Sequence, residues 1–245
     1  MRTVKMKVEY EGTRYNGWQR QSSTENTIQK KLEMVFSKME KAPLEIQGAG
    51  RTDAGVHAKG QIIHFHTSSE KSPEEMMDYA NEYLPMDIGI TEAEEVHHRF
   101  HSRLNAKGKT YIYRVWNSKV PNVLDRKFVH RILEPLKLSE MKEGASYLIG
   151  THDFQAFTSA KKKKKSTIRT IESIKIHSLG DEIQFIYKGD GFLYHMVRIM
   201  TGTLLDIGLG KREPRDIESI IKSGRREKAG PLAPANGLVL WEVHY

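Results

Sequence analysis

The chain has 245 residues, of which 38% are hydrophobic and 29% charged, a composition typical of a globular protein. It contains no cysteine, which excludes disulfide bonds, cysteine-ligated zinc and thiol nucleophiles. Lysine and arginine number 39 against 31 aspartate and glutamate, and the resulting net charge of +8 favours a polyanionic partner without requiring one.

Charged and apolar side chains alternate over residues 1–10. This period of two predicts a half-buried strand over 4–10, and the alternation leaves no apolar stretch of the kind found in a secretory signal. No apolar run approaches the roughly 20 residues that a membrane-spanning helix needs. We therefore expect a soluble protein with no membrane partner, and the absence of cysteine is compatible with a cytoplasmic location.

The rest of the first hundred residues alternates between helical and strand patterns. Apolar residues recur on one helical face over 28–39, and Ser72-Pro73-Glu74-Glu75 is a capping-box start for a second helix that ends near Leu84. Strands are expected at 44–47, 61–67 and 88–96. The first half therefore reads strand, helix, two strands, helix, strand.

The second half has a similar order of elements without an obvious sequence repeat. We expect strands at 110–116 and 238–243, a hairpin of 171–177 with 182–188, and helices at 139–150, 193–205 and 214–222. Helices packed on a largely antiparallel sheet define an α+β fold. The expected domains are residues 1–104, with the glycine-rich loop described next, and residues 105–245.

A glycine-rich connection at residues 48–58 carries the most informative side chains. Its three glycines allow positive φ and a close approach of the backbone to a ligand. Asp53 in this loop is a candidate nucleophile or base, with the guanidinium of Arg51 two residues earlier. The alternative is a turn in which Asp53 only caps the backbone. The loop lacks the Gly-Lys-Ser/Thr ending of a Walker-type phosphate loop.

Three weaker patterns leave alternatives open. Arg14, Tyr15, Trp18 and Arg20 combine basic and aromatic character, which suits an RNA contact, but Trp18 can equally belong to the core. The lysines at 161–165 are either a phosphate contact or a solvated loop. The histidine sets 64/66 and 97/98/101 show no confirming carboxylate spacing, so no metal site is predicted.

Four strings of the chain resemble motifs of the tRNA pseudouridine synthase A family. The string GRTDAGVHA at 50–58 is similar to the family's active-site motif, and YEGTRYNGWQRQ at 10–21 is similar to its first-strand signature. The second motif matches FHSR at 100–103 with KTYIY at 109–113, and the third matches GFLYHMVR at 191–198. The matches occur in the family's order and span nearly the whole chain.

This resemblance implies two related ferredoxin-like halves with mostly antiparallel sheets, helices on one face and an active-site cleft between the halves. The implied activity is the isomerisation of uridine to pseudouridine at about positions 38 to 40 of the tRNA anticodon stem-loop. The implied partners are tRNA and a second copy of the chain in a homodimer. The reaction has no net redox change, and no cofactor or metal is expected.

By similarity Asp53 is the catalytic nucleophile and Arg51 enters the RNA helix where the target base leaves. Tyr111 is expected against the flipped uracil, and Arg198 as the partner of Asp53. Each has a plainer alternative: a phosphate or carbonyl contact for Arg51, strand packing for Tyr111 and a solvent-facing Arg198. The competing functions are a catalytically inert RNA-binding protein of the same fold and a histidine-metal hydrolase.

Overall fold

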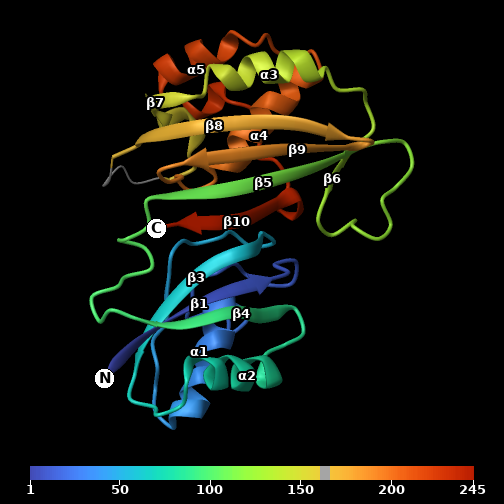
Figure 1. Cartoon of the computed structure of the whole chain (residues 1–245). Helices are drawn as coiled ribbons and strands as arrows, with labels where there is room; N and C mark the ends of the chain where they lie inside the picture. Colours follow the sequence, from blue (N-terminus) through green and yellow to red (C-terminus); the bar gives the residue numbers. More distant parts are fainter. Residues whose placement is uncertain (161–165) are drawn as a thin grey trace. The chain divides into compact units, whose positions relative to one another are not determined.

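The computed structural model describes residues 1–160 and 166–245 (Figure 1). The lysine run at 161–165 lies outside the described residues. The chain forms two compact units, Met1–Lys107 together with Val239–Tyr245, and Gly108–Leu238. The last seven residues thus group with the first unit, although sequence order had assigned them to the second half.

The first unit is built on four long strands. β1 (Arg2–Tyr10) runs antiparallel to both β3 (His57–Thr67) and β4 (Ile88–Val96). β10 (Leu238–His244) adds to β3 in parallel, and the two-residue β2 (Gln47–Gly48) pairs with β3 antiparallel. The strand pairing therefore places the start of β3, which directly follows the glycine-rich loop, in the middle of the sheet.

Two helices with side-chain caps complete this unit. Thr27 accepts a hydrogen bond from the Lys30 backbone at the start of α1 (Ile28–Glu40). α2 (Pro73–Tyr83) begins with the predicted capping box, in which Ser72 and Glu75 satisfy each other's backbone N–H groups. α1 packs on the sheet through Phe36, whose ring centroid lies 4.8 Å from that of Phe65 on β3.

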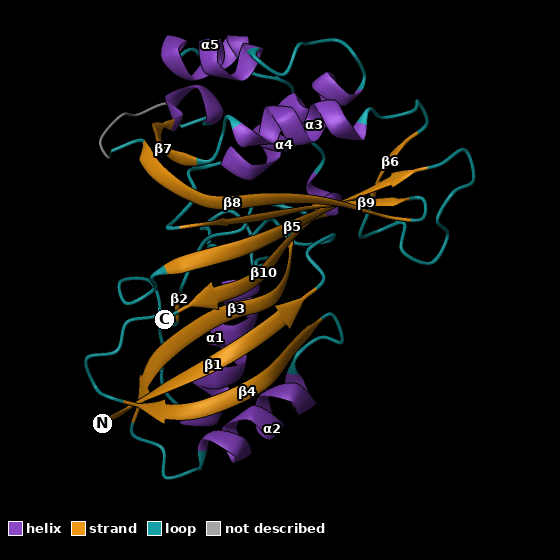
Figure 2. Ribbon diagram, turned by 45° about the horizontal axis from the view of Figure 1, so that its top comes forward, coloured by secondary structure: helices purple, strands orange, loops and turns teal. Residues whose placement is uncertain are grey.

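The second unit has an antiparallel sheet in the order β5, β9, β8, β7. These strands cover Gly108–Asn117, Glu182–Gly189, Ile168–Leu179 and Gly150–Asp153. A short β6 (His130–Ile132) pairs with β5 in parallel. Three helices lie on one side of β8 and β9 (Figure 2): α3 (Leu138–Ser146), α4 (Met196–Gly208) and α5 (Asp216–Ser223). Short 3₁₀ turns occupy Phe154–Phe157, Arg226–Lys228 and Ala235–Gly237.

The predicted α+β class is confirmed, while several element boundaries differ from those expected; β3, for example, begins at His57 and not at residue 61. The helix expected from residue 193 begins at Met196, because His195 adopts a left-handed φ of 65°. The helix expected up to residue 150 ends at Ser146, and Gly150 with φ 109° begins β7 instead. The strand expected at 44–47 is reduced to β2, whose two residues are Gln47 and Gly48.

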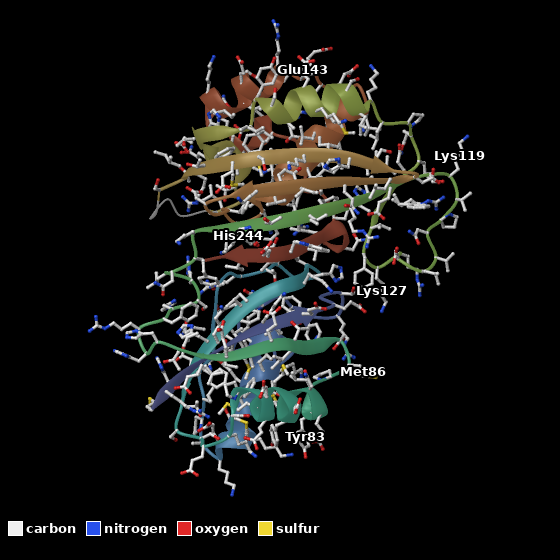
Figure 3. All side chains as sticks on the ribbon, in the orientation of Figure 1. Tyr83, Met86, Lys119, Lys127, Glu143 and His244 are labelled. Atoms are coloured by element: carbon white, nitrogen blue, oxygen red, sulfur yellow. The ribbon has the colours of Figure 1, made fainter. Side chains whose placement is uncertain are left out.

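The helices expose polar or amphipathic side chains on their outer sides. Glu143 on α3 and Tyr83 at the end of α2 are both exposed (Figure 3). Within residues 1–160 and 166–245 no helix has the length and apolar character needed to cross a membrane.

Candidate active site

The glycine-rich loop is held to β3 by backbone and side-chain hydrogen bonds. The Ala49 N–H donates to the Ile62 carbonyl at 2.7 Å. The side chain of Gln61, which is fully buried, donates to the Gly50 carbonyl at 2.8 Å and accepts from the Gly50 N–H at 3.3 Å. A buried amide that satisfies both backbone groups of one residue fixes the loop just before Arg51.

Thr52 anchors the loop immediately before Asp53. Its hydroxyl lies 2.8 Å from the hydroxyl of Tyr10 on β1, and its carbonyl accepts from the Trp18 N–H at 3.0 Å. Tyr10, Trp18 and Thr52 are all buried. Burial raises the pKa of the Tyr10 phenol, so this hydroxyl stays protonated and keeps its hydrogen bond.

Two glycines of the 10–21 string let the chain pass against the loop without side chains between them. A Cβ on Gly12 would lie 2.0 Å from the Val56 carbonyl oxygen. Gly17 has a φ of 89°, and a Cβ there would lie 2.9 Å from the Thr52 carbonyl oxygen. The resemblance between this string and a family signature therefore has a structural reason: the string packs on the loop that carries Asp53.

The aromatic residues of the same string belong to the core. Tyr15 and Trp18 are 3% and 2% exposed, which favours core packing over the RNA contact considered for them. The Tyr15 hydroxyl donates to Asp87 at 2.6 Å, and Arg14 forms an ion pair with the same carboxylate. Arg20 pairs with Glu33 at 2.8 Å. These side chains therefore brace the entry to α1 and the turn before β4.

Asp53 and Arg51 differ in exposure. Asp53 is half-buried, and its carbonyl accepts from the Val56 N–H at 3.1 Å across a turn that needs the φ of 79° at Gly55. Arg51 is exposed and forms no ion pair with a carboxylate in the part of the chain that the structure describes. The loop thus shields the carboxylate in part and leaves the guanidinium accessible.

Tyr111 lies on β5 in the second unit and is 8% exposed. It is paired in register with Tyr187 on β9, and its ring meets that of Phe192 edge-to-face at 5.1 Å between centroids. The strand pairing fixes the backbone of Tyr111, and the contact with Phe192 restricts its ring. Tyr113, two residues further on the same strand, is fully buried, and its hydroxyl donates to the Pro234 carbonyl at 2.8 Å.

Arg198 lies in the first turn of α4 and is half-buried. Its Nε donates to the Ala233 carbonyl at 2.8 Å, while its own carbonyl accepts from the Ala233 N–H at 3.2 Å. The segment before β10 therefore fixes both the backbone of Arg198 and the Nε end of its guanidinium group. Burial raises the pKa of Tyr113, and the positive charge of Arg198 acts in the opposite direction, so the two side chains are close enough to interact.

The candidate residues thus fall into two pairs. Asp53 and Arg51 lie on one loop of the first unit, and Tyr111 and Arg198 lie on β5 and α4 of the second. The residues that sequence reasoning missed are the supports, Tyr10, Gly12 and Gln61. Tyr10 and Gly12 stand in the 10–21 string, whereas Gln61 had no signal, because only the folded loop brings it to Gly50.

One histidine of the 64/66 set lies close to one of the 97/98/101 set, a proximity that the sequence did not predict. His64 is 4% exposed; its Nδ1 accepts the Ser102 N–H at 3.2 Å and lies 2.9 Å from the Ser102 hydroxyl. The rings of His64 and His101 are 4.7 Å apart. Burial, followed by the charges of His101 and His66, lowers the pKa of His64 to about 4. Among the described residues no group of three or more His, Asp or Glu side chains is arranged to hold a metal ion.

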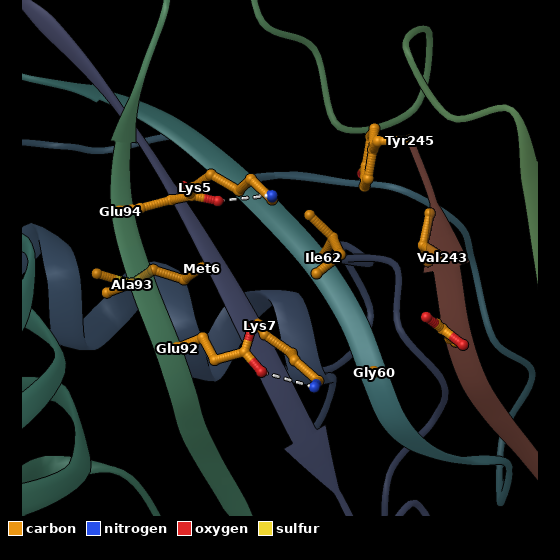
Figure 4. A pocket seen from close by; sticks show the side chains of 11 residues that line it. Lys5, Met6, Lys7, Gly60, Ile62, Glu92, Ala93, Glu94, Val243 and Tyr245 are labelled. Atoms are coloured by element: carbon orange, nitrogen blue, oxygen red, sulfur yellow. Dashed lines mark hydrogen bonds and ion pairs between the residues drawn. The ribbon is translucent and has the colours of Figure 1, made fainter.

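A polar cavity of about 380 Å³ opens on the first unit between β4 and β10 (Figure 4). Gly60 and Ile62 of β3 are among its lining residues, together with the ion pairs Lys5–Glu94 and Lys7–Glu92. Asp53 does not line this cavity. The cavity is lined by both lysine and glutamate side chains, which does not suit a polyanionic ligand.

Comparison with known proteins gives concordant matches. A family model described as tRNA pseudouridine synthase matches residues 6–105 and 145–245, ranges that contain Arg51, Asp53 and Arg198 but not Tyr111. A "tRNA pseudouridine synthase A" of Bacillus sp. (strain KSM-64) is 46% identical over 245 residues, and a "tRNA pseudouridine synthase A 2" of Clostridium perfringens (strain 13 / Type A) is 43% identical; both alignments cover all of each chain.

Among solved structures, a chain from a crystal structure of a Cbf5-Nop10-Gar1 complex matches 82% of this chain and 45% of its own length. The sequence identity is 12% and the TM-score 0.37, a likeness too small to bear on the fold.

Proposed function

The chain belongs to the tRNA pseudouridine synthase family and is an isomerase, and we propose that it converts uridine to pseudouridine at about positions 38 to 40 of the tRNA anticodon stem-loop. In this reaction the bond between N1 of uracil and C1′ of the ribose breaks, and a bond between C5 and C1′ forms. The proton leaves C5 and N1 gains one, so the atoms balance within one nucleotide. No cofactor is consumed.

Asp53 is the proposed nucleophile, which assists departure of the uracil from C1′ and holds the intermediate while the base turns. The observation that carries this assignment is the support of its loop. Buried hydrogen bonds at Gly50 and Thr52 fix the backbone on the N-terminal side of Asp53. A carboxylate on a fixed backbone, half withdrawn from water, loses little freedom when it reacts, as catalytic groups require.

Arg51 is the proposed wedge that takes the place of the extruded base. Flipping a stacked base costs a few kcal/mol, and a planar cation that fills the gap offsets part of this. The exposure of Arg51 supports this role, because the side chain needs no rearrangement of the core to reach an RNA. A simple phosphate contact by Arg51 is the alternative.

Tyr111 and Arg198 are proposed to contact the flipped uracil and the carboxylate of Asp53, respectively. Base stacking on an aromatic ring is worth roughly 1–3 kcal/mol, and the edge contact with Phe192 supports a fixed ring for this purpose. The bond from Arg198 Nε to the Ala233 carbonyl fixes the guanidinium group at one of its nitrogens, which supports a defined position for the proposed ion pair with Asp53. The proposal requires both units to contribute to one site.

Three further features belong to this proposal. Each unit is a ferredoxin-like half with helices on one face of its sheet, and the cleft between the halves receives the anticodon stem-loop. Two copies of the chain form a homodimer. The protein acts in the cytoplasm, where its tRNA substrate is found.

The proposed function is tested with the purified chain and an unmodified tRNA transcript. Chemical mapping of pseudouridine after incubation should show the modified base at about positions 38 to 40 of the anticodon stem-loop. Pseudouridine at another place would contradict the proposed target. Binding of tRNA with no pseudouridine formed would favour the inert RNA-binding alternative.

A further inference from the structure

The segment between β4 and β5 carries positive charge only. Residues 97–107, here called the basic arm, include Arg99, Arg103 and Lys107 and contain no aspartate or glutamate. All three cationic side chains are exposed, and none pairs with a carboxylate within residues 1–160 and 166–245. By contrast, Arg2, Lys5, Lys7 and Lys59 on the strands of this unit are each paired with a carboxylate.

The backbone of the basic arm is ordered by its own polar side chains. The Arg99 N–H donates to Nδ1 of His97 at 3.3 Å, and the Arg103 N–H donates to Nδ1 of His101 at 3.1 Å. Asn105 accepts from the His101 N–H at 2.7 Å. Each cation therefore comes two residues after one of the polar residues His97, His101 and Asn105, and successive cations are four residues apart. A backbone ordered before binding lowers the entropic cost of binding.

A buried serine ties the basic arm to the strand that leads into the catalytic loop. Ser102 is fully buried, and its hydroxyl donates to the carbonyl of Gln47 at 3.0 Å. Its carbonyl accepts from the Tyr245 hydroxyl at 2.6 Å. Gln47 is the first residue of β2, after which the chain enters the loop with Asp53. The position of the basic arm is therefore fixed relative to that loop within the first unit.

The acidic strand before the basic arm does not cancel its charge. Each carboxylate on β4 that faces β1 is already paired with a cation of β1. The pairs are Glu92 with Lys7 at 2.8 Å, Glu94 with Lys5 at 2.7 Å and Glu95 with Arg2 at 3.0 Å (Figure 4 shows the first two). The carboxylates of β4 are thus neutralised on the sheet and do not offset the three cations of the basic arm.

We propose that the basic arm binds the phosphate backbone of the tRNA on which Asp53 acts, with Arg99, Arg103 and Lys107 as the phosphate ligands. This inference rests on the proposed function and adds the surface that positions the RNA. Exposed guanidinium and ammonium groups suit phosphodiester oxygens. Because phosphate contacts carry no sequence information, the basic arm holds the substrate without choosing the uridine.

The test is the salt dependence of tRNA binding by Arg99→Ser/Arg103→Ser/Lys107→Ser. Loss of three phosphate contacts should lower the slope of log Kd against log salt by about 2 to 3, and weaken binding roughly 10- to 100-fold at 0.15 M salt. The KM for tRNA should rise in parallel with Kd, as expected when contacts that bind the substrate are lost.

A matched control removes three exposed, unpaired cations from the helical layer of the second unit. Lys142→Ser/Lys211→Ser/Arg215→Ser changes the net charge equally and should leave the slope within about 0.5 of wild type. Arg99→Lys/Arg103→Lys keeps the charge and should retain most of the slope. Equal slopes for the two triple variants would overturn the proposal, and so would loss of the slope in the lysine variant.

The outcomes separate this inference from the proposed function. If the wild-type chain forms no pseudouridine, the proposed function fails whatever the slopes are. If it forms pseudouridine and the arm variant binds like the control, only the inference fails. Thermal unfolding of each variant shows whether it is folded; should the triple variant unfold, Arg99→Ser and Arg103→Ser are measured singly, each with an expected slope change of about 0.7 to 0.9.

Discussion

The hydroxyl of Tyr10 lies 2.8 Å from the hydroxyl of Thr52, the residue directly before Asp53. The two residues come from β1 and from the glycine-rich loop, and both are buried. A hydrogen bond between buried hydroxyls persists because neither group can turn to water. Through this bond the first strand of the chain fixes the position from which Asp53 is presented.

Removal of this hydrogen bond by Tyr10→Phe should lower kcat more than it changes KM. The substitution leaves the Thr52 hydroxyl buried without its partner, at a cost of about 1–3 kcal/mol in the free energy of unfolding. Urea unfolding and steady-state kinetics measure the two effects. Tyr83→Phe, at the exposed end of α2, is the control and should change neither by a measurable amount. A Tyr10→Phe enzyme with unchanged kcat would show that the bond does not position the loop.

Gly12→Ala tests the close approach of the 10–21 string to the glycine-rich loop that carries Asp53. The added methyl group would lie 2.0 Å from the Val56 carbonyl oxygen, so one of the two segments must move. We expect kcat to fall at least tenfold, with tRNA affinity retained within a few-fold. Gly89→Ala on β4 meets no atom within 4 Å and is the matched control. Equal kinetics for both variants would refute the expected steric coupling.

The buried His64 predicts a loss of stability at acidic pH. Its pKa of about 4 lies below the 6.5 of an unfolded histidine, so between these values the unfolded chain binds the proton and the folded chain does not. The neutral, buried His64 therefore contributes to the free energy of unfolding above about pH 6.5. This contribution is lost as the pH falls toward 4, by up to about 3 kcal/mol. Urea unfolding at pH 7 and 4.5 measures it. The pH-dependent loss should be smaller in His64→Gln, and an equal loss would reject the assignment.

A chelator distinguishes the isomerase from a histidine-metal hydrolase. The described residues hold no cluster suited to a metal ion, and the proposed chemistry proceeds through a carboxylate. Pseudouridine formation should therefore be unchanged after dialysis against EDTA, in a buffer that keeps the tRNA folded with monovalent salt. Activity that is lost with EDTA and restored by added zinc would favour the hydrolase reading.

Local patterns were sufficient to predict most of the elements and the hairpin of β8 with β9, but not the pairing of strands far apart in the sequence. The capping box at Ser72 and the alternation over 4–10 depend on neighbouring residues, and both led to correct elements. β6 and β7 have three and four residues, too few to show a period. The start of α4 depends on the left-handed φ of His195, which nothing in its side chain predicts. The parallel addition of β10 to β3 is a long-range pairing that no local pattern encodes.

In the candidate site, too, local motifs could be recognised in the sequence and long-range contacts could not. Glycines and a carboxylate drew attention to the loop, and the resemblance to a family assigned roles to Asp53, Arg51, Tyr111 and Arg198. The supports of the loop could not be predicted, because Tyr10 and Gln61 reach it only through the register of β1 and β3. The sequence therefore indicated the candidate residues that stand in short continuous motifs, whereas the residues that hold them in position were found only in the folded structure.

The central claim is that one carboxylate performs the chemistry, and single-turnover formation of pseudouridine by Asp53→Asn tests it most directly. The substitution keeps the size of the side chain and removes the nucleophile. We predict that the rate falls at least 10³-fold, as expected when an activated nucleophile is lost, while tRNA binding stays within a few-fold of wild type. Turnover within tenfold of the wild-type rate would contradict the assignment of Asp53.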